Sequence, residues 1–171
     1  MCLRTNGKVH LAVSDKIVYK FGYPSNDDRN IVFAPIFINH YYKFNEISTS
    51  SLKMEDDFTV RIGIHSFKSK FDAFKQMLLY NRYTPQELKL FRCVIPSGSY
   101  YYDGKMDGDN CKNYASNQII FVNEVNTNSL SMRLYNYYLT HKSAIDIVLR
   151  LWTIITIFFA LIFIPYLIFN I

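Results

Sequence analysis

The longest apolar run in the chain is its last stretch, Leu151 to Ile171, which reads LWTIITIFFALIFIPYLIFNI and carries no charged side chain. At about 1.5 Å of rise per helical residue this run covers roughly 30 Å, which is the thickness of the hydrocarbon core of a bilayer. A single segment in hydrocarbon must satisfy its backbone amides internally, so the run predicts a transmembrane helix. The alternative is a buried core helix of a soluble domain, although such a helix normally keeps a polar face.

The residues around this run predict how it begins and where it meets the membrane surface. Ser143 and Asp146 have the spacing of a capping box, which predicts that the helix starts there. Arg150 lies just outside the apolar boundary and Trp152 just inside it, and both residue types prefer those positions. Pro165 removes one backbone donor, which a kink, a water or a neighbouring helix must offset. We therefore interpret Arg150, Trp152 and Pro165 as membrane-anchor residues.

Upstream of residue 143, apolar and polar positions follow the period of strands. Residues 58–65, FTVRIGIH, alternate so that Phe58, Val60, Ile62 and Ile64 share one face, which predicts a half-buried strand with His65 on its polar face. Polar segments at residues 45–57 and 103–110 predict loops. β-Branched and aromatic residues predict further strands at residues 16–23, 31–34, 89–95 and 119–125. A second element is predicted to follow residues 31–34, after the break at Pro35.

One soluble segment has the period of a helix. Ser69 can cap residues 70–81, KFDAFKQMLLYN, in which Phe71, Phe74 and Leu78 recur at helical spacing. The sequence therefore predicts an α+β fold, with a small mixed or antiparallel sheet packed on one main helix and followed by a single C-terminal transmembrane helix. The predicted domains are a cytoplasmic α+β domain (1–125), a juxtamembrane linker (126–142) and the transmembrane helix (143–171).

Charge and composition predict on which side of the membrane the N-terminal domain lies. The 171-residue chain has a formal net charge of +5, all of it before the apolar tail. The opening MCLRTNGKVHLAV lacks the apolar run of a secretory signal, and Lys142 and Arg150 flank the tail on its N-terminal side. We therefore expect a tail-anchored, single-pass membrane protein with its N-terminal domain in the cytoplasm and the lipid bilayer as one partner.

The cysteines and acidic residues give no indication of a metal site or a cofactor. Cys2, Cys93 and Cys111 are odd in number and widely spaced, which is typical of a reducing compartment. The aspartates of the loop at 103–110 do not have the spacing of a calcium-binding loop. Basic side chains on the helix at 70–81 suit a solvated face, and nothing indicates a nucleic acid. The many Phe and Tyr residues predict an aromatic core, with an aromatic-lined ligand groove as the alternative.

Several short pieces of the chain form a recognisable set: the opening MCLRTNGK, IVYK at residues 17–20, GIHSFKSKFDA at 63–73, CVIPSGSYYYDG at 93–104 and YASNQIIF at 114–121. Together they resemble a group of small phage and bacterial proteins without an assigned activity. In that group a Gly-x-His-Ser segment opens a helix, and an Ile-Pro-x-Gly-Ser-x-Tyr-Tyr turn leads into a Tyr-x-Ser strand. The resemblance implies a common fold and no particular reaction. The acidic insertion between Gly104 and Asn113 and the membrane tail depart from the compact members.

The sequence predicts a candidate binding site formed by His65, Ser66 and Tyr101. The His65 imidazole would lie beside the N-terminus of the helix at 70–81, whose free amides suit a phosphate or carboxylate. The alternative interpretation is a structural histidine bonded to a backbone carbonyl. The order of strands also permits an ADP-ribosyltransferase-like enzyme, with Glu124 as the acid near the last strand, although its usual Glu-x-Glu pair is missing.

No complete catalytic constellation emerges from these residues, and no catalytic residue is assigned. The sequence therefore favours a non-enzymatic protein, held to a bilayer by its tail, that acts by contacting an unidentified protein partner. The alternative is a small enzyme acting on a nucleotide or phosphate near His65.

Overall fold

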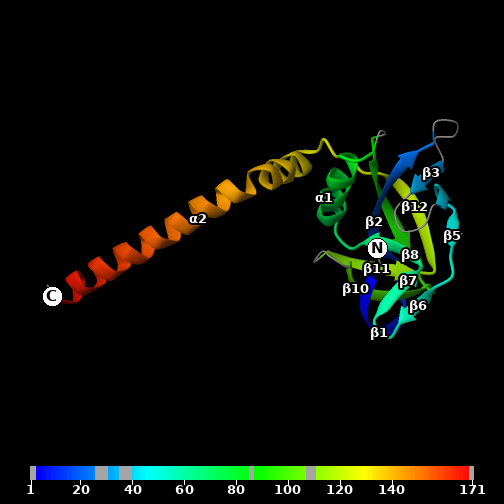
Figure 1. Cartoon of the computed structure of the whole chain (residues 1–171), viewed down its shortest axis with the longest axis horizontal. Helices are drawn as coiled ribbons and strands as arrows, with labels where there is room; N and C mark the ends of the chain where they lie inside the picture. The colour runs from blue at the N-terminus through cyan, green and yellow to red at the C-terminus, as the bar shows by residue number, and fades with distance from the viewer. Residues whose placement is uncertain (1–2, 26–30, 35–39, 85–86, 107–110, 170–171) are drawn as a thin grey trace. The chain divides into compact units, whose positions relative to one another are not determined.

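A computed structural model describes residues 3–25, 31–34, 40–84, 87–106 and 111–169. The chain divides into two compact units, residues 1–127 and residues 128–171. The first unit is built on strands with one helix, and the second is one long helix (Figure 1). The strands are β1 (Leu3–Leu11), β2 (Lys16–Pro24), β3 (Ile31–Ala34), β4 (His40–Lys43), β5 (Ile47–Thr49), β6 (Lys53–Asp56), β7 (Thr59–Ile62), β8 (Ile64–Phe67), β9 (Lys89–Ile95), β10 (Tyr100–Met106), β11 (Lys112–Ser116) and β12 (Gln118–Glu124); the helices are α1 (Lys70–Asn81) and α2 (Leu130–Phe169).

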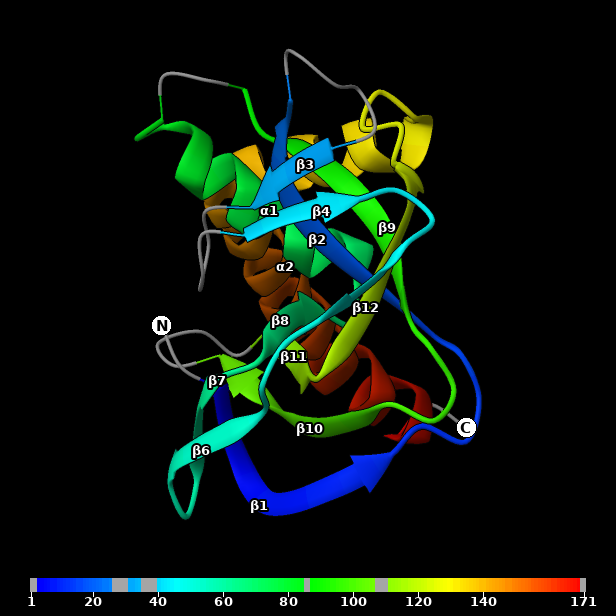
Figure 2. The same cartoon turned by 90° about the vertical axis from the view of Figure 1, so that its right-hand side faces the viewer.

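The strands form one sheet in the order β5-β12-β9-β2-β8-β11-β10-β1-β7-β6, with β3 beside β2 and β4 beside β3. All pairings between these described strands are antiparallel, and an isolated parallel bridge joins Phe44 to Phe121. The sheet bends strongly, so that β1, β6, β7 and β10 lie at one end of the unit and β3 and β4 at the other (Figure 2). The predicted α+β class, with a sheet, one short helix and a C-terminal apolar helix, is confirmed.

Aromatic rings fill the interior of the bent sheet. Phe121 on β12 has no exposed surface and stacks on Tyr42 at 4.6 Å between ring centroids. Phe91 and Phe44 contact the same ring at 5.7 and 6.4 Å. Val18 and Cys93, paired across β2 and β9, are also fully buried in this cluster. The aromatic residues here form a packed core, as the sequence predicts for most of them.

Helix α1 covers the other face of β2, and it begins and ends as predicted. The Ser69 side chain caps it by accepting a hydrogen bond from the Phe71 amide at 3.2 Å. Its buried side chains are Ala73, Phe74, Gln76 and Met77, and it contacts β2, β8 and β9. Phe21 on β2 packs beneath it against Tyr80, with 5.7 Å between the rings.

The sequence misplaced several strands. The predicted strand at 58–65 is broken at Gly63, whose φ of 154° suits glycine, into the separate strands β7 and β8. Residues 45–57, predicted as a loop, contain β5 and β6. These are short strands of polar residues at the two ends of the sheet path, so they lack an apolar alternation from which they could be recognised. Strand β1, which carries little apolar periodicity, was also not predicted. Strand β10 includes residues 103–106 of the other predicted loop, whose residues 107–110 lie outside the described part of the chain.

Glycine at position 104 lets β1 and β10 approach each other. A Cβ atom there would lie 2.0 Å from the carbonyl oxygen of Arg4, a backbone atom of the paired strand. We expect Gly104→Ala to separate the two strands and to lower the free energy of unfolding by at least about 2 kcal/mol. The exposed neighbour Lys105 provides a control, since Lys105→Ala should change stability by less than about 0.5 kcal/mol. Equal urea midpoints for the two variants would refute this explanation.

Helix α2 begins earlier than the sequence predicts. It is already helical at Leu130, so that residues 130–142, predicted as part of a linker, are continuous with the apolar segment instead of ending at a cap on Ser143. The reason is that no proline or glycine interrupts residues 130–164, so nothing in the backbone stops the helix upstream of Ser143. The helix also continues through Pro165 to Phe169.

Candidate functional site

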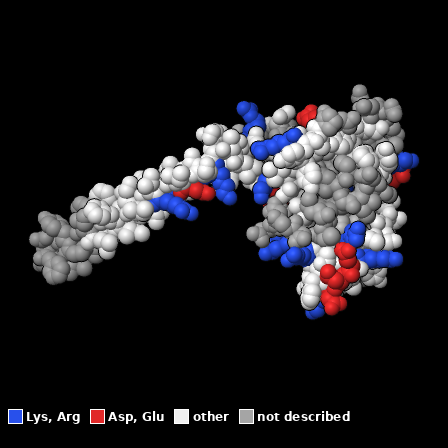
Figure 3. Space-filling view, viewed as in Figure 1, with Lys and Arg blue, Asp and Glu red and all other residues white. Residues whose placement is uncertain are grey.

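Helix α2 has the length and the composition of a membrane span. Its 40 residues correspond to about 60 Å, roughly twice the hydrocarbon thickness. The segment Leu130–Leu161 has a mean hydropathy of 2.1 in its most apolar window, and none of that window is buried. All the charged residues of α2 lie between Arg133 and Arg150, and Figure 3 shows charge on the first half of the helix only. The two halves therefore suit different surroundings, water for the first and hydrocarbon for the second.

Two of the three predicted anchor residues, Arg150 and Trp152, lie where this division occurs. Arg150 is exposed and is the last charged residue, and Trp152 follows it with 67% of its surface exposed. An indole ring and a guanidinium at such a boundary both suit the headgroup region. Pro165 lies inside the apolar half, where the helix continues past it.

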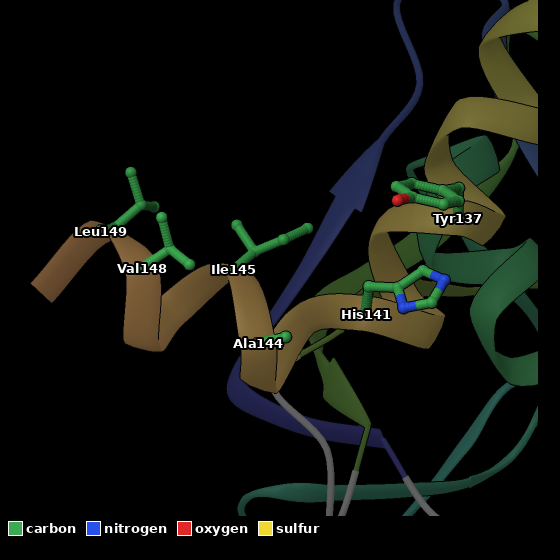
Figure 4. Close-up of a pocket in the computed structure, with 6 residues that line it drawn as sticks. All are labelled: Tyr137, His141, Ala144, Ile145, Val148 and Leu149. Carbon is green, nitrogen blue, oxygen red and sulfur yellow. The ribbon is translucent and has the colours of Figure 1, made fainter. Parts of the chain in front are cut away.

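A shallow groove lies on the first half of α2 (Figure 4). It is lined by Tyr137, His141, Ala144, Ile145, Val148 and Leu149. The Tyr137 and His141 rings are packed one turn apart, with 4.4 Å between their centroids. Apart from these two rings the groove is lined by aliphatic side chains, and all its residues come from one helix, so its shape suits another apolar chain segment better than a small molecule.

In the first unit, His65 lies inside the protein and not on an exposed polar face. It is 2% exposed, because every residue of β8 is buried between β2 and β11. Burial, together with the nearby Lys20 ammonium, lowers the pKa of His65 to about 4. The imidazole is therefore neutral near pH 7 and has little access to solvent.

The structure does not bring His65, Ser66 and Tyr101 together. Ser66 is buried on the opposite face of β8 from His65, and Tyr101 lies two strands away on β10, with β11 between them. The register pairs Tyr101 with Ser116 and Ser116 with Ile64, so Tyr101 shares a face with Ser66 and points away from His65. Ser66 Oγ is buried and has no hydrogen-bond partner within the described part of the chain. These residues do not form a common cleft of the predicted kind.

Sequence reasoning missed the buried lysine of this region. Lys20 is 4% exposed, donates a hydrogen bond from Nζ to the carbonyl oxygen of His65 at 2.9 Å, and lies 5.6 Å above the Tyr42 ring. Burial lowers the pKa of Lys20 to about 8, and the nearby Cys93 opposes this shift. Strand alternation places Lys20 on the same face of β2 as Val18, which indicates that it is buried. Its burial was not predicted because lysine side chains are mostly exposed to solvent.

The acidic candidates are engaged in ion pairs. Asp103 accepts a hydrogen bond from Lys68 Nζ at 2.6 Å, and the same ammonium lies 4.4 Å above the Tyr114 ring. Glu124, the acid of the ADP-ribosyltransferase-like interpretation, is exposed and lies 3.9 Å from Lys89 Nζ. The described residues contain no group of three side chains placed to hold a metal ion.

Several apolar side chains of the first unit face solvent. Leu11 and Tyr100 are paired across β1 and β10 and are 53% and 52% exposed. Val9, two residues from Leu11 on the same face, is 53% exposed, and Val13 in the following turn is 86% exposed. An exposed apolar group of this kind is typical of surfaces that bind other proteins.

The fold and α2 together define the class of the protein: an α+β unit with one C-terminal helix capable of spanning a membrane. No family model, no curated protein and no solved structure matches the chain.

Proposed function

We propose that the chain is a single-pass membrane protein in which α2 crosses the bilayer and the α+β unit lies on the cytoplasmic side. The observation that carries the proposal is the second half of α2, where no residue after Arg150 is charged and the described residues up to Leu161 are all exposed. In water, such a surface of large apolar residues would be strongly unfavourable. In hydrocarbon the exposure of the same apolar surface is favourable, and the helical backbone satisfies its own hydrogen bonds.

The proposed orientation is supported by the distribution of basic residues. Arg133, Lys142 and Arg150 all precede the apolar half of α2. Basic residues that flank a span within about 15–20 residues favour the cytoplasmic side. The α+β unit precedes these residues and would therefore remain in the cytoplasm.

We further propose that the α+β unit acts by binding another protein. The apolar side chains of Val9, Leu11, Val13 and Tyr100 support a binding role, since they face solvent on one part of the sheet. The burial of His65 and Ser66 argues against a solvent-accessible enzyme site around these two residues.

Flotation of membranes on a density gradient tests the anchor. The full chain should float with the vesicles, whereas the double variant Ile157→Arg with Leu161→Arg should not, since each arginine in the hydrocarbon costs about 3 kcal/mol. The matched control Leu139→Arg with Ile147→Arg adds the same charge to the first half of α2 and should float. Aggregates sink in this assay, so they are not mistaken for membrane-bound protein.

Two outcomes would refute the proposal. A wild-type chain that stays out of the floating fraction would eliminate the membrane anchor. A floating chain whose α+β unit is digested by protease added outside intact cells would eliminate the cytoplasmic orientation and leave the anchor in place.

A further inference from the structure

Helix α2 changes direction near residues 141–144, as Figure 1 and Figure 4 show. We call residues 130–141 the first arm and residues 144–169 the second arm. The groove of Figure 4 lies on the inner side of the bend, because Tyr137 and His141 of the first arm and Ile145, Val148 and Leu149 of the second arm all line it. The inner angle between the two arms is therefore lined mainly by apolar side chains.

The first arm carries an exposed apolar stripe on the side of this inner angle. The stripe consists of Leu130, Leu134, Tyr137, Tyr138 and His141, all of them exposed. Their spacing of i, i+4, i+7, i+8 and i+11 is typical of one face of a helix. Asn136 and Thr140 lie on the opposite side and are also exposed. The other apolar residues of this arm lie off the stripe and are buried or half-buried, namely Met132, Tyr135 and Leu139.

The bend lies close to the depth of the lipid headgroups when the second half of α2 spans the bilayer. Ala144 precedes Leu151, where the charge-free run begins, by about 10 Å of helix. One headgroup layer is about 5–8 Å thick, and a tilt of the span brings the bend nearer to the hydrocarbon. The first arm therefore turns aside at the level where a helix can lie along the membrane surface. This layer is hydrated, so Lys142 and Asp146 keep their solvation there.

The direction of the bend turns the stripe toward lipid. When one arm of a bent helix crosses a membrane and the other lies along its surface, the inner angle between them faces the bilayer. This angle is lined by Tyr137 and Val148. Asp146 and Arg150 each lie two residues from Val148, which places them on the opposite side of the helix, toward water.

The residue types around the stripe suit the headgroup layer. Tyrosine and tryptophan are enriched at the membrane–water interface, and the first arm has Tyr137 and Tyr138 on the stripe, while Trp152 follows in the second arm. Arg133 lies at one border of the stripe. Its aliphatic stem can pack beside the stripe while its guanidinium binds a lipid phosphate. Left in water, an apolar stripe of this kind would be unfavourable.

We infer that the first arm of α2 lies along the surface of the bilayer that the second arm crosses, with its apolar stripe inserted among the lipid headgroups. This inference rests on the proposed function, because it takes the second half of α2 as the span. The two arms then contact the same bilayer, one across it and one along it.

Quenching of a fluorescent label by modified lipids tests the inference. The full chain is reconstituted into vesicles, and one introduced cysteine carries the environment-sensitive dye NBD. Cys2 is replaced by serine in every variant, and Cys93 and Cys111 are buried, so they stay unlabelled in the folded protein. The quencher is a phospholipid with a nitroxide near the headgroup end of its acyl chain.

The labelled positions form matched pairs. Leu134→Cys and Tyr138→Cys place the dye on the stripe. Asn136→Cys and Thr140→Cys are their controls, because each lies two residues further along, exposed and on the opposite side. An interfacial helix buries its apolar face by about 5–10 Å, so the stripe dyes should be quenched at least about twofold more strongly than the controls. Ile157→Cys reports the span itself, and a nitroxide at the methyl end of the acyl chain should quench its dye.

The outcomes separate this inference from the membrane proposal. Stronger quenching at 134 and 138 than at 136 and 140 supports the surface-bound arm. Equal quenching at stripe and control positions, with the dye at 157 quenched by lipid, overturns the inference and leaves the span standing. Stripe dyes with blue-shifted emission that the nitroxide lipid does not quench also overturn it, because a protein then covers the stripe. A dye at 157 that no lipid quenches eliminates the span, and this inference with it.

Discussion

Replacing Phe121 by alanine is expected to lower the free energy of unfolding of the α+β unit by about 3–5 kcal/mol. The ring is completely buried, stacks on Tyr42 at 4.6 Å and also contacts Phe91 and Phe44. The variant loses the burial of the ring, and the neighbouring rings cannot fill the cavity without leaving their own positions. For a unit of this size, the loss corresponds to a fall of roughly 10–20 °C in Tm.

A sensitive readout is the reactivity of the Cys93 thiol in the full chain, held in detergent micelles. Cys93 has no exposed surface, so it reacts only when the core opens. Phe58→Ala is the matched control, because Phe58 is 65% exposed and its removal should change stability by less than about 0.5 kcal/mol. Similar labelling curves for the two variants would show that the aromatic cluster is not the centre of the fold.

Mild acid should destabilise the α+β unit, because His65 is buried as a neutral imidazole. The pKa of His65 is lowered to about 4 in the folded protein, mainly by burial, against an ordinary value of 6.5. Between these values the unfolded chain binds a proton that the folded protein does not, so stability falls as the pH falls from 6.5 to 4. A shift of this size corresponds to about 3 kcal/mol over the full window.

The measurement is the urea midpoint as a function of pH, followed by near-ultraviolet circular dichroism. In His65→Gln the slope between pH 6.5 and 4 should be markedly smaller, whatever the absolute stability of the variant. Phe58→Ala, which removes an exposed side chain that binds no proton, should keep the wild-type slope. Parallel profiles for wild type and His65→Gln would mean that His65 does not control the acid response.

The elements with clear apolar periodicity were predictable from the sequence. The helix predicted at residues 70–81 is α1, and both the Ser69 cap and the apolar spacing indicate it. The strand predicted at residues 89–95 is β9. The apolar run after Arg150 also identified the candidate span. In each of these cases local propensity and burial favour the same structure, so a single sequence carries enough information.

The candidate site was less predictable because it depends on strand order. Alternation in residues 58–65 placed His65 on an open face, but β8 lies between β2 and β11 and is buried on both sides. Which strands become neighbours follows from long-range pairing, and local periodicity does not contain it. Lys20 was missed for the same reason, since its burial arises from packing against Tyr42 and the carbonyl of His65.

Strand β6 has a consequence for the behaviour of the protein in concentrated solution. Among the described strands it pairs with β7 alone, its register shifts twice within four residues, and it carries Lys53, Glu55 and Asp56. Irregular backbone and charge at the border of a sheet discourage the addition of a strand from another molecule. Growth of aggregates by strand addition at this border of the sheet is thereby discouraged, even where many copies are crowded together.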